Sequence, residues 1–240
     1  MDLISGEIIG IDKPLGWTSF DAVKRLRGAI TRRLGVKKFK VGHAGTLDPL
    51  ATGVLIICTG KATREIERLQ AGSKEYIADI RLGATTPSFD LETEVDATFP
   101  WEHITRQSVE EILPEFRGKV MQVPPVFSAV KVDGKRAYKF ARKGEEVELK
   151  AKPLEISELE ILSFEPPLLR IRVVCSKGTY IRALARDIGK ALGSGGHLVG
   201  LRRTRVGDMD IDKCLTIDEA MEKITTGPLE FPEDYVNNKK

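Results

Sequence analysis

Asp48 stands in a short loop whose composition suits a carboxylate that does chemistry. The loop spans residues 42–53, and Asp48 is the only charged side chain between His43 and Lys61. Pro49 fixes its own φ and disfavours a helical conformation at the preceding residue, while the loop's glycines allow tight turns and close approach by a ligand. An aspartate before a proline also caps turns, so the loop alone leaves a catalytic role and a turn-capping role open.

Arg182 is the second candidate for chemistry, because a cation at its position in a helix is unfavourable without a carboxylate partner. It lies in the first turn of a helix predicted over 178–192. A cation near the N-terminal end of a helix costs a few tenths to about 1 kcal/mol, and a carboxylate partner would offset that cost. If the partner is Asp48, the ion pair keeps that carboxylate ionised and in place. The alternative is an arginine on the surface.

Two tyrosines, a histidine and a group of arginines lie where they can contact a nucleic acid. Tyr76 and Tyr180 are near predicted strand ends, where a ring can stack on a base, although a buried core tyrosine is the common alternative. His43 is either an ordinary loop histidine or a wedge against nucleic acid. The segment 200–206 contains three arginines, Arg202 among them, which suits phosphate contact more than burial.

The composition indicates a cytoplasmic globular protein. Its 240 residues are 41% hydrophobic, which is enough for one large or two small domains. No apolar run reaches the length of a membrane span, and the first residues lack the layout of a signal peptide. Cys58 and Cys175 lie in apolar runs typical of buried strands, and the cysteines and histidines show no metal-binding spacing. We therefore expect no metal site.

Positive charge is concentrated in one segment. Residues 21–40 contain eight lysines and arginines against Asp21 alone, whereas residues 208–240 carry nine acids and four lysines. A basic segment such as 21–40 is typical of a protein that binds a polyanion, because each phosphate that it neutralises releases counterions. A solvated helix face is the alternative.

Hydrophobic periodicity and turn residues predict an α+β (mixed α/β) fold. The segment 18–34 has apolar residues at three- or four-residue spacing, which predicts a helix with its basic residues exposed. Strands and helices do not alternate as βαβ units, which favours a largely antiparallel sheet. We expect strands over 6–12, 54–58, 75–83, 127–132, 153–164, 168–175 and 200–206, further helices over 61–69, 105–116, 135–143, 178–192 and 216–224, and a polar loop over 84–100.

Several blocks, taken together and in order, resemble the tRNA pseudouridine-55 synthases of the TruB family over roughly residues 6–207. A lone aspartate loop would be a weak signal, whereas separate blocks in the same order are a strong one. The blocks are Asp-Lys-Pro-Leu-Gly-Trp-Thr-Ser at 12–19, the loop 42–53, Lys-Glu-Tyr at 74–76 with Leu-Gly-Ala-Thr-Thr-Pro-Ser-Phe-Asp at 82–90, Pro-Pro-Val-Phe-Ser-Ala-Val-Lys at 124–131 with Tyr138 and Arg-Lys-Gly at 142–144, Gly-Thr-Tyr-Ile-Arg at 178–182, and Leu-Arg-Arg at 201–203.

The resemblance implies a pseudouridine synthase fold, with a largely antiparallel central sheet flanked by helices and loops. It implies a catalytic domain over 1–207 and a short acidic tail over 208–240, where many relatives carry a complete RNA-binding domain of the PUA type. The implied roles are nucleophile for Asp48, its charge partner for Arg182, stacking on the target uracil for Tyr76, pocket walls for Tyr180 and Leu201, filling the space of the extruded base for His43, and phosphate or loop contacts for Lys13 and Lys131.

The implied reaction isomerises uridine to pseudouridine in the T-arm stem-loop of tRNA. It breaks the N1–C1′ bond, turns the base and rejoins it through C5, so no redox change takes place and no cofactor is needed. An ionised carboxylate can attack C1′ or C6, or remove a proton from C2′, and the sequence leaves the three routes open. Extruding the base costs a few kcal/mol, and stacking on an aromatic ring at roughly 1–3 kcal/mol offsets that cost.

Two other functions are consistent with parts of the sequence. A non-catalytic RNA-binding or chaperone module would keep the basic helix 18–34 but would not need Asp48 or Arg182. A guide-dependent pseudouridine synthase of the dyskerin type works inside a ribonucleoprotein, with a complete PUA domain and protein partners. Because this chain is short, we expect tRNA as its partner and no obligatory protein partner.

Overall fold

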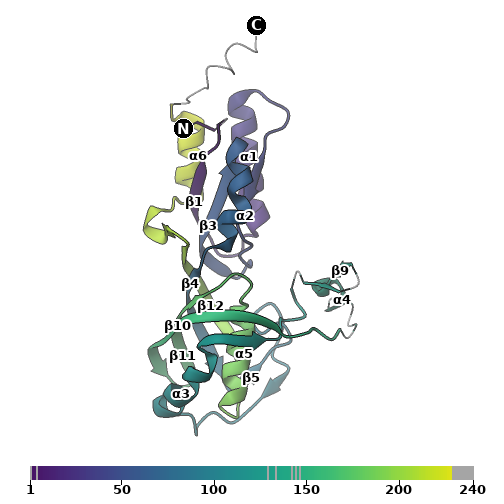
Figure 1. Ribbon diagram of the computed structural model, residues 1–240, viewed down its shortest axis with the longest axis vertical. Helices are drawn as coiled ribbons and strands as arrows, with labels where there is room; N and C mark the ends of the chain where they lie inside the picture. Colours follow the sequence, from purple (N-terminus) through teal and green to yellow (C-terminus); the bar gives the residue numbers. More distant parts are fainter. Residues whose placement is uncertain are drawn as a thin grey trace. The chain divides into compact units, whose positions relative to one another are not determined.

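The computed structural model describes residues 2–228 except 4, 129, 133, 142, 144 and 146. The chain forms two compact units (Figure 1), of which unit 1 comprises residues 1–74 and 202–240 and unit 2 comprises residues 75–201. It passes from one unit to the other within two strands, β4 (Lys74–Leu82) and β12 (Gly196–Val206). The functional division that the sequence predicts at residue 207 stays a prediction.

Unit 1 is an antiparallel sheet with helices. β1 pairs with β3 along its whole length, from Ile8 opposite Cys58 to Lys13 opposite Gly53. β2 also pairs with β3, and β13 pairs with the last residues of β12. The bounds are β1 Ile8–Lys13, α1 Ser19–Leu34, β2 Val41–His43, β3 Ala51–Thr59, a 3₁₀ helix Gly60–Glu65, α2 Ile66–Ala71, β13 Met209–Asp210, a 3₁₀ helix Ile211–Lys213 and α6 Ile217–Thr226.

Helix α1 confirms the prediction for 18–34. Thr18 is its N-cap: the Thr18 side chain accepts a hydrogen bond from the backbone of Asp21, and the Asp21 carboxylate accepts one from the Thr18 backbone. This capping box satisfies two backbone donors that a helix start otherwise leaves free. Leu26 and Ile30 are fully buried in a cluster that also contains Ile224 of α6. The basic side of α1 is therefore turned away from the core.

Unit 2 is built on the strand order β12, β4, β11, β10, β7. Strand β10 pairs antiparallel with both β11 and β7. The side chains of β4 alternate as predicted, since Tyr76, Ala78, Ile80 and Leu82 are buried and the residues between them are not. The bounds are β5 Ala84–Thr85, β6 Ala97–Thr98, α3 Arg106–Ile112, a 3₁₀ helix Leu113–Phe116, β7 Gly118–Gln122, β8 Lys131–Val132, β9 Lys135–Arg136, α4 Ala137–Ala141, β10 Lys152–Glu165, β11 Leu168–Cys175 and α5 Ile181–Ala191.

The fold class is confirmed, and the differences lie in short elements. The predicted helix 61–69 is a 3₁₀ helix followed by the six-residue α2, and the predicted strand 127–132 is reduced to β8. The segment 84–100 is more ordered than a polar loop, because β5 pairs with β6 at its ends. Between them, the hydroxyl groups of Thr86 and Ser88 donate to the carbonyl of Asp90. Local side-chain bonds of this kind fix loops that hydrophobic periodicity does not detect.

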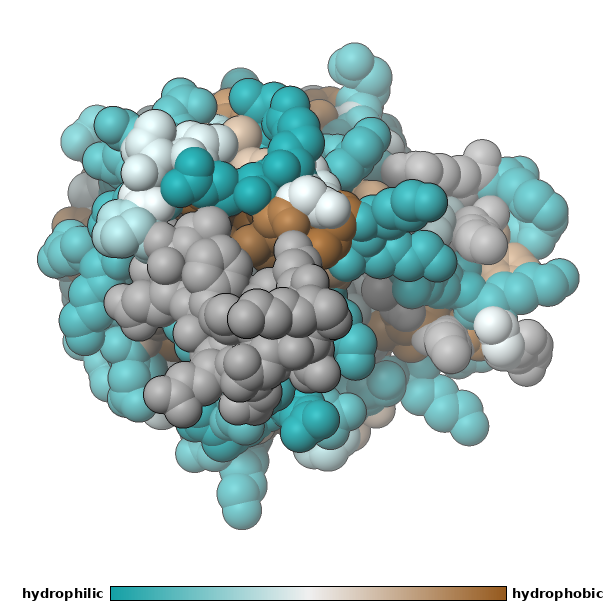
Figure 2. Space-filling view, turned by 90° about the horizontal axis from the view of Figure 1, so that it is seen from above, coloured by the Kyte–Doolittle hydropathy of each residue, from teal (hydrophilic) through white to brown (hydrophobic). Residues whose placement is uncertain are grey.

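Hydrophilic side chains predominate among the coloured residues of the face shown in Figure 2. This agrees with the 30% of charged residues in the chain. None of the helices in the described part of the chain has the length and apolar character needed to cross a bilayer.

Candidate active site

The Asp48 loop is held by hydrogen bonds to the start of α1. The Ser19 hydroxyl donates to the carbonyl of Leu47 at 3.0 Å and accepts from the Leu47 backbone N–H at 2.8 Å. The backbone N–H of Gly16 donates to the carbonyl of Pro49 at 2.8 Å. The residues on both sides of Asp48 are thus fixed to the turn and helix that follow β1. A carboxylate mounted in this way is preorganised, which is what a nucleophile requires.

Arg203 of β12 fastens the loop from its other side. Arg203 is 1% exposed, and its guanidinium group donates to three backbone carbonyls, those of Val54 at 2.7 Å and of Thr46 and Gly45 at 3.3 Å. Gly53 lies so close that a Cβ there would collide with the backbone of Arg203, and its φ is +104°. Glycine is required at that position because only it combines this φ with so close an approach.

The three arginines of 200–206 do not share one role. The expectation of phosphate contact is wrong for Arg203, because its buried guanidinium group donates its hydrogen bonds to carbonyls of the Asp48 loop and of Val54. Arg202 is 43% exposed in its side chain and pairs with Asp12 of β1 at 2.7 Å. Arg202 and Arg203 differ in burial because adjacent side chains of a strand point to opposite faces of the sheet. Phosphate contact by Arg202 stays a prediction.

Lys13 is fully buried at the end of β1, and its ammonium group holds the next turn. It donates to the carbonyls of Pro14 at 3.0 Å and Trp17 at 2.7 Å. Burial lowers the pKa of Lys13 to about 8, the charge of Asp48 raises the pKa and that of Arg203 lowers it further. The structure places the positive charge of Lys13 within electrostatic range of Asp48. The predicted phosphate or loop contact of Lys13 stays a prediction.

The lowered pKa of Lys13 makes stability depend on pH. Between its folded value of about 8 and the ordinary value of 10.5, the unfolded chain binds the Lys13 proton and the folded chain does not. Stability therefore rises with pH across this window. We expect the free energy of unfolding to increase by about 1–3 kcal/mol more between pH 7.5 and 10 in the parent than in Lys13→Met.

Denaturant unfolding at the two pH values measures this difference. Lys119→Met, at an exposed lysine of β7, is the control and should keep the parent's pH dependence. Equal pH dependence in the parent and in Lys13→Met would contradict the lowered pKa.

His43 ends β2 and enters the Asp48 loop. Burial lowers its pKa, and a hydrogen bond with the Gly45 backbone offsets part of that effect. The imidazole is therefore neutral at pH 7, which suits a ring that packs against a base more than one that binds a phosphate. Its role as a wedge stays a prediction.

Arg182 is the centre of the polar site in unit 2. It is 5% exposed and donates to the carbonyls of Ser88 at 3.1 Å and Phe127 at 2.9 Å. Its Nε lies 3.6 Å from Oδ2 of Asp90, which is also buried. The alternative of a surface arginine is therefore wrong. Pairing of Arg182 with Asp48 stays a prediction.

Asp90 is a site residue that the sequence reasoning missed. Phe89, just before it, has a φ of +63°, a left-handed conformation that is rare for a bulky residue and clusters at functional sites. The guanidinium carbon of Arg186 lies 4.8 Å from the centroid of the Phe89 ring. The block at 82–90 in the sequence ends at Asp90 and was the available signal.

Four further candidates lie in unit 2. Tyr76 in β4 is 8% exposed. Tyr180 is the N-cap of α5 and is half-buried, and the Gln122 side chain bonds both its backbone N–H and its carbonyl, at 2.9 and 3.2 Å. Leu201 lies half-buried in β12, and Lys131 begins β8. Their predicted contacts with a base or phosphate stay predictions.

The histidines, cysteines and acids of the described residues form no metal-binding group.

Burial raises the pKa of both Cys58 and Cys214 to about 11. Thiols of this kind are protonated at neutral pH and are poor nucleophiles. Asp48 is therefore a better candidate nucleophile than either thiol.

Two protein-family models match the chain, and together they span residues 31–228. Residues 31–181 match the N-terminal domain of TruB family pseudouridylate synthases. Residues 182–228 match the C-terminal domain of tRNA pseudouridylate synthase B. The second match includes much of the acidic segment that follows β12.

Individual proteins show the same similarity. The chain is 61% identical over 234 residues to tRNA pseudouridine synthase B of Parabacteroides distasonis, covering 98% of this chain and 100% of that one. It is 66% identical over 222 residues to the protein of that name from Phocaeicola vulgatus, covering 92% and 94%. Among solved structures, a chain of a Cbf5–Nop10–Gar1 complex is 29% identical with a TM-score of 0.68 over 95% of this chain. That match spans 58% of the solved chain.

Proposed function

The chain belongs to the TruB family of pseudouridylate synthases, and from this premise we propose that it isomerises uridine 55 in the T-loop of tRNA to pseudouridine. The observation that carries the proposal is the Asp48 loop. Arg203, Ser19 and Gly16 hold its backbone on both sides of a single carboxylate. A non-catalytic RNA-binding module would have no use for a carboxylate presented so rigidly.

In the proposed reaction Asp48 acts as the nucleophile on an extruded uridine. Its carboxylate attacks C1′ or C6, or removes a proton from C2′ that is returned at the end. Each route breaks the N1–C1′ bond and forms a C5–C1′ bond, while the C5 proton is released to solvent and N1 takes up a proton. The ring of Tyr76 stacks on the base, and Tyr180 and Leu201 bound its pocket. His43 fills the space that the base leaves. Arg182 is the charge partner of Asp48.

Release of tritium from C5 of labelled uridine tests the activity, because forming the C5–C1′ bond expels that hydrogen. The purified protein should release tritium from a T-loop transcript whose uridines are all labelled at C5, and not from the same labelled transcript with cytidine at position 55. Release of tritium from the cytidine-55 transcript, through another uridine, would place the target elsewhere. No release from either RNA would overturn the proposed activity.

The likeness to a chain of a Cbf5 complex keeps a guide-dependent mode as the second candidate. The two modes differ in what the purified chain does alone. We expect it to modify an isolated T-arm stem-loop without any guide RNA or added protein. Activity that appears only after such additions would favour the guide-dependent mode.

Substitutions of Tyr76 test whether this buried ring serves the chemistry. Tyr76→Phe should retain the parent's melting temperature because it keeps the ring, and should lose activity if the hydroxyl helps to remove the C5 proton. Tyr76→Leu should lose activity through the missing stacking. Because Tyr76 is 8% exposed, Tyr76→Leu should also lower stability by about 1–3 kcal/mol.

Turnover on tRNA and melting temperature, measured for both variants, separate the two effects. A folded Tyr76→Leu protein with the parent's turnover would show that the residue is structural only. The matched control is Leu82→Ala, on the same buried face of β4, which should lower stability without a specific loss of turnover in the folded fraction.

A further inference from the structure

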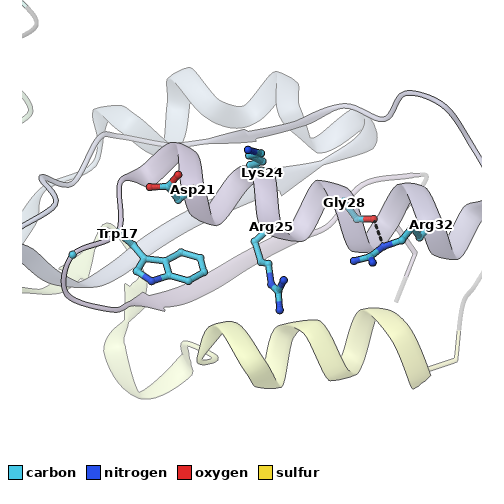
Figure 3. Close-up of a pocket in the computed structure, with 7 residues that line it drawn as sticks. Trp17, Asp21, Lys24, Arg25, Gly28 and Arg32 are labelled. Carbon is cyan, nitrogen blue, oxygen red and sulfur yellow. Dashed lines mark hydrogen bonds between the residues drawn. The ribbon is translucent and has the colours of Figure 1, made fainter.

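A groove of about 480 Å³ lies along the exposed side of α1. Trp17 and the first turn of α1 form one end of the groove, and Arg32 forms the other (Figure 3). Lys24 and Arg25 point away from the helix on either side of it, and Arg32 folds back over Gly28. The lining of the groove includes Trp17, Asp21, Lys24, Arg25, Gly28 and Arg32.

The basic side chains that line this groove are not neutralised by ion pairs within the described part of the chain. Among the described residues, Lys24, Arg25 and Arg32 form no ion pair with a carboxylate, and Arg32 uses only its Nε, which donates to the Gly28 carbonyl at 3.1 Å. The single acid, Asp21, is engaged in the capping box of α1, where its hydrogen bonds with Thr18 lower its pKa. Three positive charges thus line one groove and remain available to an anion.

Gly28 gives the groove its open floor. Glycine is among the least favourable residues inside a helix, yet a Cβ at Gly28 would meet no atom within 4 Å. Packing therefore does not require a glycine there. The missing side chain instead leaves the backbone open between Lys24, Arg25 and Arg32.

The groove is connected to the Asp48 loop through α1. Ser19, in the first turn of the helix, exchanges two hydrogen bonds with Leu47. With a rise of 1.5 Å per residue, Arg25 and Arg32 lie about 9 and 20 Å further along the helix. An RNA whose target nucleotide reaches Asp48 can therefore span this distance with a few flanking nucleotides.

We propose that the α1 groove binds the ribose-phosphate backbone of the substrate tRNA outside the reacting nucleotide. The proposal deepens the proposed function and rests on it. RNA is favoured as the occupant because its phosphates recur along a strand as the cations do along α1, and because the exposed part of Trp17 offers a surface for a base. Binding here adds affinity and orients the strand that continues from Asp48.

The salt dependence of tRNA affinity tests the proposal. Arg25→Ala/Arg32→Ala should weaken binding of a tRNA transcript about tenfold at 0.1 M salt, and should flatten the slope of log affinity against log salt by up to about 2. Lys119→Ala/Lys190→Ala removes the same charge from exposed positions in unit 2 and should keep the parent's affinity and slope. Equal behaviour of the two double variants would overturn the proposal, and the groove would then be a solvated face or a site for another partner.

A second pair of variants tests the floor of the groove. Gly28→Glu and Gly28→Gln have nearly the same size and differ in charge, so Gly28→Glu should bind tRNA severalfold more weakly than Gly28→Gln if phosphates lie there. Gly28→Ala should raise the melting temperature, which verifies that the helix tolerates the change. Equal affinity of the Glu and Gln variants would overturn the proposal. Binding is measured apart from turnover, so an inactive parent would refute the proposed function without deciding this test.

Discussion

Asp48→Asn is expected to abolish isomerisation and to leave tRNA affinity within several-fold of the parent. Asparagine is nearly isosteric with aspartate, and hydrogen bonds of Ser19, Gly16 and Arg203 fix the loop backbone on both sides of Asp48. The loop should therefore keep its shape. Loss of a nucleophile costs at least about 10⁴-fold in turnover, whereas phosphate contacts supply most of the affinity for RNA.

Tritium release and filter binding measure the two quantities on one preparation. Asp212→Asn, at an exposed acid in the same unit, removes the same charge and should keep the parent's turnover. Measurable turnover by Asp48→Asn that is free of deamidated protein would show that another group starts the reaction. A comparable loss of affinity would mean that Asp48 shapes the RNA-binding surface instead.

Elements with regular periodicity were predictable from the sequence. Helix α1 has apolar residues at helical spacing and the capping residue Thr18, and β4 alternates strictly. In both elements the local sequence pattern agrees with the tertiary packing, so residues only a few positions apart are enough to predict the secondary structure. The Asp48 loop was recognisable for a similar reason, because its proline and glycines restrict the backbone locally.

The partners of the charged site residues were not predictable in this way. Arg203 bonds carbonyls about 150 positions earlier in the chain, and Arg182 meets Asp90 across 92 positions. Neither pairing follows from composition or periodicity, because both depend on which strands and loops the fold brings together. The sequence therefore marked Arg203 as one of three basic strand residues and marked Asp90 only as the end of the block 82–90, within a predicted polar loop. Both residues are almost completely buried.

Substitutions at the Arg182–Asp90 pair should separate catalysis from stability. Arg182→Met removes the cation from a buried carboxylate and leaves the carbonyls of Ser88 and Phe127 without this donor. Breaking a buried pair by removing one partner costs about 3–5 kcal/mol, which lowers the melting temperature by roughly 10 °C in a chain of this size. Turnover should fall far more than tRNA affinity, because the proposed role of Arg182 is to partner Asp48 rather than to hold a phosphate.

The double variant Arg182→Met/Asp90→Asn decides between a catalytic and a purely structural role. It replaces the ion pair with two neutral groups, so no buried charge is left uncompensated and much of the lost stability should return. Turnover should not return with it, because the guanidinium group is still missing. Recovery of stability and turnover together would show that Arg182 only supports the fold. Equal losses of turnover and affinity in the folded Arg182→Met protein would show instead that Arg182 holds RNA.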